Sequence, residues 1–452
     1  MINLHTMKHS KSQFPVFVCT LFLAVLALVS CEEKSNEDSP EKIAKRTVLI
    51  YMCGENNLDT QHTYDPVTKT YLTYYACDSA EIVRGAKLLP ENINLIVFAD
   101  KKSKRQKPFI AKVDKNGMHI TKQYNEEEYS IDKYFMTEVV KWTFAKYPAE
   151  TYAMTFWGHG NGWIMMSENY TTTTSQKVKR KAYGTDTGSD NADGGDGYEK
   201  HINIPQLAEV LSQAPHLDYV FFDCCQMMSA EVVYELRNVC DYIIGSPAEI
   251  PGFGAPYEYV VPAFFLPKDE VGRAIIDNYI IHSDFSEYGG QPLSAVKTKN
   301  MENLLTVTKN CIDTVMVHYP YPNNIPLYDI IYYGRNPLSA SLPIFYDLRN
   351  VMRKYLSEKD FEQWDNVFQQ TVVYSIHPKD ITETKREDWM SSELSITHFH
   401  QFKMNDENYG GLSMFIPQTY YSDISYRYLN PNVSIKALEW NKTIDWEQYN
   451  WE

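Results

Sequence analysis

Short apolar runs alternate with amphipathic segments through the first half of the chain. The runs are typical of strands buried on both faces of a sheet: Val48 to Met52, Ile93 to Ala99, Tyr152 to Phe156, Tyr219 to Phe222 and Tyr242 to Gly245. Helical periodicity lies between them, over Ile131 to Ala145, Ile204 to Ser212 and Met227 to Arg237. Lys107 to Tyr124 is typical of a β-hairpin, because its Asn116-Gly117 pair suits a turn with positive φ. This alternation predicts a doubly wound α/β fold.

The second half of the chain has a weaker pattern. Helices are predicted over Glu270 to Ile281 and Met301 to Met316, with a strand signal at Leu293 to Val296. We therefore expect an α/β domain over residues 45–262, followed by a C-terminal region over residues 263–452. That region is either a small separate domain or an extension packed on the sheet.

Two reactive side chains follow directly after predicted strands. His159 comes after the run that ends in Phe156, and Cys225 comes after the run that ends in Phe222. The carboxyl ends of parallel strands meet at one edge of a sheet, so these two side chains are expected to lie together. A neighbouring imidazole favours the thiolate that makes a cysteine nucleophilic. Taken singly, each residue is also compatible with a packed histidine or an inert buried thiol.

The motifs around these residues resemble those of the caspase-like cysteine peptidases, and most closely the clostripain family. The matching segments are Thr47 to Met52 with Asn57-Leu58, then His159-Gly160-Asn161-Gly162-Trp163, then Asp223-Cys224-Cys225-Gln226-Met227. The resemblance implies a caspase-like three-layer fold with a central, mostly parallel sheet. It also implies a cysteine endopeptidase with a Cys225-His159 dyad, in which the N–H groups of Gly160 and Cys225 form the oxyanion hole. No third catalytic residue is evident.

The matching makes Cys225 rather than Cys224 the nucleophile. Alternation along a strand sends the two side chains to opposite faces, and it leaves Asp223 on the same face as Cys225. Asp223 could then pair with a substrate Arg or Lys, as the resemblance implies, or it could cap the helix predicted from Met227. Phe253 stands where some relatives supply a second acidic residue, which makes it an alternative determinant of the pocket.

The stretch from Thr171 to Tyr198 lacks core-forming residues and is predicted to be an exposed, mobile loop. It carries the basic residues Lys177, Lys179, Arg180 and Lys181, which lie between the motifs of His159 and Cys225. The resemblance implies that family members are cut in this region during activation, so these four residues are candidate self-cleavage sites. Its acidic part could bind calcium through Asp186, Asp190, Asp193 and Asp196, although the spacing is not that of an EF-hand loop. No other metal or cofactor is expected.

The amino terminus is predicted to be a targeting signal. Lys8 and Lys11 precede an apolar run from Phe14 to Val29 that is short for a membrane span, and the sequence before Cys31 resembles the lipobox of bacterial lipoproteins. Residues 1–30 are therefore read as a signal peptide, Cys31 as the lipidation site and residues 31–44 as a flexible tether. The alternative is a transmembrane anchor with a chance cysteine. Lipidation predicts a protein of the bacterial cell envelope, at the outer membrane or cell surface.

Charge and composition narrow the function further. The formal net charge of −15 argues against a nucleic-acid partner, because phosphate binding requires clustered Lys and Arg. Together with this, the resemblance implies a lipid-anchored cysteine endopeptidase that cleaves protein or peptide substrates after Arg or Lys. The alternative is a catalytically silent lipoprotein of the same fold that binds glycans or partner proteins through its 34 Tyr residues.

Overall fold

The computed structural model describes residues 43–103, 105–165, 183–188, 200–285, 290–334, 343–377, 404–422 and 430–451. Ile43 to Glu452 form one compact unit. Within the described ranges, no helix has both the length and the apolar character needed to cross a membrane. The predicted signal peptide, Cys31 and the four basic residues Lys177, Lys179, Arg180 and Lys181 lie outside the described residues.

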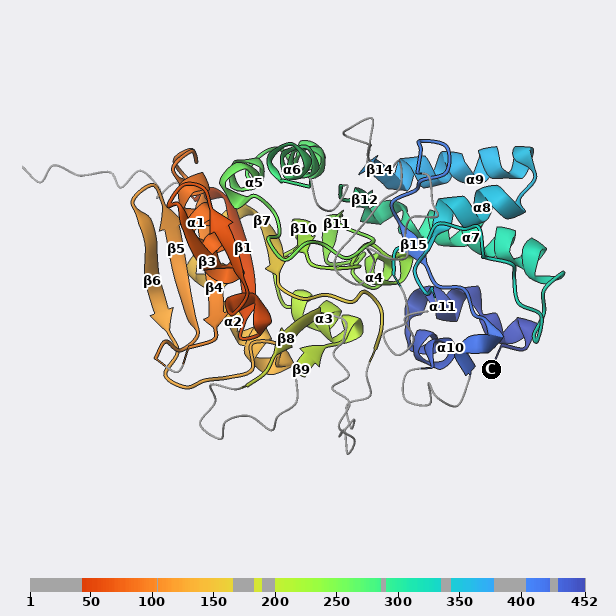
Figure 1. Cartoon of the computed structure of the whole chain (residues 1–452), viewed down its shortest axis with the longest axis horizontal. Helices are drawn as coiled ribbons and strands as arrows, with labels where there is room; N and C mark the ends of the chain where they lie inside the picture. Colours follow the sequence, from red (N-terminus) through yellow and green to blue (C-terminus); the bar gives the residue numbers. More distant parts are fainter. Residues whose placement is uncertain are drawn as a thin grey trace, which may run out of the picture. The chain divides into compact units, whose positions relative to one another are not determined.

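A central sheet of nine strands organises the described part of the chain, in the order β14-β12-β11-β10-β7-β1-β4-β5-β6 (Figure 1). Its parallel core consists of β1 (Ala44–Gly54), β4 (Asn94–Lys101), β7 (Ala149–Trp157), β10 (Leu217–Asp223) and β11 (Cys240–Gly245). Antiparallel strands flank this core: β5 (Phe109–Asp114) and β6 (Gly117–Gln123) on one side, β12 (Leu293–Lys297) and β14 (Val372–Ile376) on the other. The five predicted parallel strands and the predicted hairpin are confirmed.

The two faces of the sheet are buried under two separate hydrophobic cores. Along β1, Leu49 and Tyr51 belong to one core, while Val48 and Ile50 belong to the other, as strand alternation requires. One core is covered by α1 (Tyr74–Ala86), α5 (Tyr257–Ala263) and α6 (Lys268–His282). The other is covered by α2 (Lys133–Lys146), α3 (Ile204–Leu211), α4 (Ala230–Glu235), α7 (Met301–Met316), α8 (Leu348–Tyr355), α9 (Glu358–Thr371) and α11 (Glu439–Ile444). The three-layer α/β/α architecture is thus confirmed.

Short elements complete the part of the fold that the structure describes. Three two-stranded sheets pair β2 (His62–Asp65) with β3 (Thr70–Thr73), β8 (Tyr183–Asp186) with β9 (Lys200–Ile202), and β13 (Tyr346–Asp347) with β15 (Ser413–Met414). The single-turn helices are η1 (Asn57–Asp59), η2 (Thr298–Asn300), η3 (Thr419–Ser422), α10 (Pro431–Ser434), η5 (Ile435–Ala437) and η6 (Trp446–Tyr449).

Two local predictions are wrong in part. The helix predicted from Met227 begins only at Ala230, because the Ser229 side chain accepts a hydrogen bond from the Val232 N–H and caps it. The loop predicted over residues 171–198 contains a buried strand at Tyr183–Asp186. Tyr183 is fully buried and its hydroxyl donates to the carbonyls of Tyr51 and Trp157, a long-range packing that local composition does not reveal.

The C-terminal part of the chain is built onto the sheet. Beyond the pairing of β12 and β14, the Ser413 N–H donates to the Met228 carbonyl at 3.0 Å, and the Phe415 N–H donates to Glu231 at 2.8 Å. Both acceptors lie just after Cys225 in the chain. The region therefore packs directly behind the loop that carries the candidate nucleophile.

A buried arginine ties the opposite, amino-terminal edge of the sheet together. Arg46 on β1 pairs with Asp218 on β10 at 2.6 Å, and both residues are almost fully buried. The same guanidinium donates to Thr151 and to the carbonyls of Phe264 and Leu266. One side chain thus joins β1, β7, β10 and the end of α5.

We expect Arg46→Met to lower the free energy of unfolding by about 3–5 kcal/mol, because it leaves a buried carboxylate and two carbonyls without their donor. Chemical denaturation measures the change. Lys45→Met, at the exposed neighbouring position, is the matched control and should be close to neutral. Equal stability of the two variants would show that the Arg46 pair adds nothing to the fold.

Candidate active site

The register of two neighbouring strands brings His159 and Cys225 to the same place. β7 and β10 are parallel neighbours, and Trp157 at the end of β7 pairs with Asp223 at the end of β10. His159 and Cys225 each lie two residues beyond this last pair. Parallel strands are about 4.8 Å apart, so the two residues leave the sheet side by side at its carboxyl edge. The sequence-based pairing of these residues agrees with this geometry.

Two glycines allow the chain to turn at His159. Gly158 has φ +138°, a conformation that other residues rarely adopt, and it ends the extended course of β7. Gly160 lies against the Cys225 backbone: a Cβ at Gly160 would stand 2.6 Å from the Cys225 carbonyl oxygen and 3.2 Å from the Cys225 nitrogen. Only a residue without a side chain permits this approach, so the backbones of the two motifs are in contact.

The Cys225 thiol faces the loop that follows β11. The Ile250 N–H donates to the Cys225 sulfur at 3.3 Å. Burial, followed by the negative charge of Glu249, raises the pKa of the Cys225 thiol to about 12, and the Ile250 bond offsets only part of this shift. At neutral pH the thiol is therefore protonated until a base removes its proton.

Cys224 has the opposite environment. Its side chain is fully buried and its thiol lies 3.3 Å from the Phe156 carbonyl. Burial raises the pKa of the Cys224 thiol well above its ordinary value. The expected division between a buried Cys224 and a Cys225 on the other face agrees with these surroundings.

A third residue contacts the candidate base. The His159 Nε2 lies 2.6 Å from the Asn57 side-chain oxygen, in the turn η1 that follows β1. The preceding Asn56 holds this turn, since its side chain accepts from the Leu58 N–H and donates to the carbonyls of Cys53 and Thr185. The sequence analysis found no third residue, although Asn57-Leu58 belongs to the first matching motif.

Asp223 is nearly buried, with 3% of its surface exposed. Its carboxylate accepts from the Ala255 N–H at 3.0 Å and from the hydroxyls of Tyr257 at 3.0 Å and Tyr279 at 3.3 Å. Burial raises the pKa of Asp223 to about 6 against the lowering effect of these bonds. The alternative role as a helix cap is wrong, because Ser229 caps α4.

A second carboxylate, from α1, lies beside Asp223. A Cβ at Gly254 would stand 2.7 Å from the Asp223 carboxylate and 3.4 Å from that of Asp78. Asp78 accepts from the Trp157 indole N–H at 2.6 Å, and burial raises its pKa well above the ordinary value, with smaller contributions from Glu81 and Asp223. Sequence reasoning missed Asp78, because nothing in α1 itself shows that it faces this edge of the sheet.

Phe253 lies beside the same loop and is half-buried. Its ring packs on Phe285, which stacks on Tyr279, the residue whose hydroxyl reaches Asp223. Phe253 is thus linked to the Asp223 site through aromatic packing.

Of the four aspartates considered as calcium ligands, the structure describes Asp186 alone. Its carboxylate accepts from the Ser130 N–H, the Ser130 hydroxyl and the Gly188 N–H. Asp190, Asp193 and Asp196 lie outside the described residues.

The chain is similar to known cysteine peptidases over most of its length. The model of the clostripain family matches residues 50–451. No curated protein matches the sequence. A secreted C11 cysteine protease from Bacteroides thetaiotaomicron, solved with an irreversible peptide inhibitor, is 26% identical with a TM-score of 0.65, over 90% of this chain and 100% of that one.

Two more distant structures share the fold. An inactive zymogen C11 protease from Parabacteroides distasonis is 22% identical with a TM-score of 0.63, over 89% of this chain and 99% of that one. Another secreted C11 protease from Bacteroides thetaiotaomicron, iotapain, is 18% identical with a TM-score of 0.64, over the same shares. Because the family model spans most of the sequence, the chain belongs to the clostripain family and is a cysteine peptidase that acts on proteins or peptides.

Proposed function

We propose that Cys225 is the nucleophile and His159 the general base of this peptidase. The observation that carries the proposal is the register of β7 and β10, which leaves both residues two positions beyond the last paired residues. The contact between Gly160 and the Cys225 backbone supports it. Asn57 is a positioning residue, since it touches the His159 ring on the Nε2 side.

The contact between His159 and Asn57 determines which ring nitrogen of His159 carries the proton. An amide oxygen only accepts hydrogen bonds, so the His159 Nε2 carries the ring proton toward Asn57 and Nδ1 holds the free electron pair. Nδ1 takes the Cys225 proton as the sulfur forms a bond to the substrate carbonyl carbon. The imidazolium then protonates the leaving amine as the C–N bond breaks, and water hydrolyses the remaining thioester. The high pKa of Cys225 makes this base necessary at neutral pH.

The oxygen of the attacked carbonyl becomes negative and requires donors. We assign the Gly160 and Cys225 N–H groups to this role, because their backbones lie in contact and a backbone N–H can stabilise an oxyanion.

We expect Cys225→Ala and His159→Ala each to lower peptide hydrolysis by about 10⁴-fold or more, because each removes one partner of the dyad. Cys224→Ala is the matched control: it should retain most of the activity, since its thiol lies in the core. Initial rates on a peptide substrate measure both. If Cys224→Ala is the inactive variant, the assignment of the nucleophile is wrong.

We further propose that Asp223 selects Arg or Lys before the scissile bond, with Asp78 adding negative charge. Among the described residues neither carboxylate is paired with a Lys or Arg; their partners are N–H, phenol and indole groups. Two buried carboxylates side by side favour a cation, and the position of Asp223 two residues before Cys225 puts this charge close to the nucleophile. Phe253 occupies the position where some relatives have a second acidic residue, and in this chain Asp78 supplies the second negative charge.

Asp223→Asn should reduce the preference for Arg or Lys over an apolar residue by about thirty- to a hundredfold, equivalent to about 2–3 kcal/mol, because it removes a desolvated charge pair. Values of kcat/KM for matched peptides measure the preference. Asp269→Asn, at an exposed site, should leave it unchanged. A wild-type enzyme that cleaves equally well after apolar residues would contradict this role and point to Phe253.

The envelope location and the maturation of the enzyme are proposals from the sequence. We propose that Cys31 is acylated and anchors the chain in a membrane of the cell envelope. We also propose that the enzyme activates itself by cutting after Lys177, Lys179, Arg180 or Lys181, since these residues match its proposed specificity and lie between the two catalytic motifs. β7, which precedes the cut, pairs with β10, which follows it, so both fragments share one sheet.

Mass spectrometry of the wild-type protein purified from membranes is expected to find two amino termini. One is acylated Cys31, and the other lies near residues 178–182. Cys225→Ala should show the first terminus alone, because the cut requires the enzyme's own nucleophile. A second terminus in Cys225→Ala would assign the cut to another protease, and a soluble wild-type protein without acyl groups would exclude the anchor.

A further inference from the structure

Four exposed apolar side chains lie around the amino-terminal edge of the sheet, on the side covered by α1 and α5. Ile43 precedes β1, Leu88 follows α1 and Leu266 follows α5, and their exposed fractions are 53%, 68% and 38%. Val67, which is 58% exposed, lies in the turn between β2 and β3. Each has an exposed lysine one or two positions away in the sequence: Lys45, Lys69, Lys87 and Lys268. We call these eight residues the amino-edge surface.

Hydrogen bonds join three of these positions at the start of β1. The Asn92 side chain, in the loop between α1 and β4, donates to the Ile43 carbonyl at 3.2 Å. This bond holds the loop that contains Leu88 against the first residues of β1. The Arg46 guanidinium donates to the Leu266 carbonyl at 2.6 Å, which brings the end of α5 to the same place.

The turn between β2 and β3 is tied to this surface through α1. Asp65 in the hairpin is fully buried and accepts from the Val67 N–H at 3.0 Å. The same carboxylate lies 3.5 Å from the guanidinium of Arg84, in the last turn of α1, and Arg84 pairs with Glu258 on α5 at 2.6 Å. Residues four positions apart share one face of a helix, so the chain after Arg84 leads directly to Leu88. The hairpin turn, the end of α1 and the end of α5 therefore form one continuous surface.

The chain outside the described residues enters the fold at this surface. Cys31 is twelve positions before Ile43 (43 minus 31), and twelve residues reach at most about 40 Å. An acyl group on Cys31 therefore keeps the amino-edge surface within that distance of the membrane. Here the inference rests on the proposed acylation of Cys31.

We propose that the amino-edge surface rests on the membrane that holds the anchor. Its apolar side chains insert among the lipid headgroups, and the neighbouring lysines extend their ammonium groups to the lipid phosphates. Glu91 and Asp269 are exposed at the same edge, so the attraction comes from apolar insertion and not from net positive charge. Four partly inserted side chains bind weakly by themselves, but the anchor holds them at a high effective concentration beside the lipid.

This orientation turns the catalytic edge of the sheet away from the membrane. β1 has 11 residues, and at about 3.3 Å per residue its two ends lie about 33 Å apart. The amino-edge surface lies at its first end, and Asn57, which contacts His159, lies just beyond its second end. The anchored enzyme therefore cleaves proteins and peptides outside that membrane, and a bond within the headgroup layer lies out of its reach.

The test uses the acylated Cys225→Ala chain, purified from membranes and returned to phosphatidylcholine vesicles. The vesicles contain a photoreactive phosphatidylcholine with a diazirine near the headgroup end of one acyl chain. After illumination, mass spectrometry of the digested protein locates the labelled peptides. Peptides with Val67, Leu88 or Leu266 should be labelled about tenfold or more above peptides from residues 55–60 and 249–254, at the catalytic edge.

A double variant tests whether the apolar side chains cause this orientation. Leu88→Ser combined with Leu266→Ser should remove most of the excess labelling at the amino-edge surface, because it removes two of the inserted side chains. Ile281→Ser is the matched control, since Ile281 is 72% exposed near the other end of α6, and its labelling pattern should equal that of the parent. Both variants should melt close to the parent temperature, because all three positions are exposed.

Three results would overturn the inference: equal labelling of the two edges, stronger labelling of the catalytic edge, or an unchanged pattern in the double variant. The first means that the anchored chain tumbles freely, and the second that the catalytic edge faces the lipid. The third means that other residues hold the chain in its orientation.

These outcomes are separate from those of the proposed function. A chain that is purified without acyl groups overturns the anchor, and the orientation with it, but leaves the assignment of Cys225 and His159 untouched. An acylated chain with even labelling overturns the orientation alone. In the chain that retains Cys225, the double variant should hydrolyse a soluble peptide at the parent rate, because the amino-edge surface does not touch the dyad.

Discussion

The parallel pairing of β7 with β10 in the middle of the sheet is the constraint on which the candidate site depends. It aligns Trp157 with Asp223, so that the next residues of both strands leave the sheet together. Gly158 ends β7 with a positive φ, and Gly160 lets the two loops touch. A shift of one residue in this register would turn His159 or Cys225 to the other face. The sheet thus determines where His159 and Cys225 lie, and the loops after β7 and β10 carry these two side chains.

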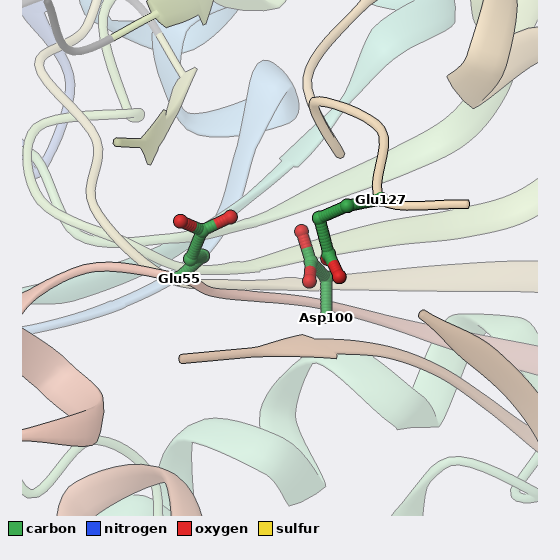
Figure 2. Close-up of side chains that lie close together, drawn as sticks. All are labelled: Glu55, Asp100 and Glu127. Atoms are coloured by element: carbon green, nitrogen blue, oxygen red, sulfur yellow. The ribbon is translucent and has the colours of Figure 1, made fainter. Parts of the chain in front are cut away.

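Several buried carboxylates lie at the carboxyl ends of the parallel strands. Asp78 and Asp223 lie close together beside Gly254, and the carboxylates of Glu55, Asp100 and Glu127 lie close to one another (Figure 2). Each group is costly to bury, and each is compensated differently. Hydrogen bonds from Ala255, Tyr257 and Tyr279 hold Asp223, whereas Asp100 is left among other carboxylates. The two sites therefore differ in how their buried negative charge is compensated.

The C-terminal part of the chain has a structural task in the same fold. It extends the central sheet through β12 and β14, and the Ser413 and Phe415 amides hold the chain after Cys225 from behind. Trp163, from the motif of His159, packs on Phe345 and Phe415. The loops that carry the candidate residues His159 and Cys225 therefore pack on residues that come much later in the sequence.

The sequence by itself determined the parts that rest on local patterns. Apolar runs predicted the five parallel strands, Asn116-Gly117 predicted the hairpin, and the positions of His159 and Cys225 after two strands predicted their meeting. These signals are local because periodicity and turn chemistry depend on near neighbours. Tertiary structure alone decided the rest: the burial of Tyr183, the contact of Asn57 with His159, and the convergence of Asp78, Asp100 and Glu127 on this edge. The residues that surround these side chains are distant in the sequence. From the sequence alone an acidic residue is expected to be exposed to solvent, and only the tertiary structure shows that it is buried.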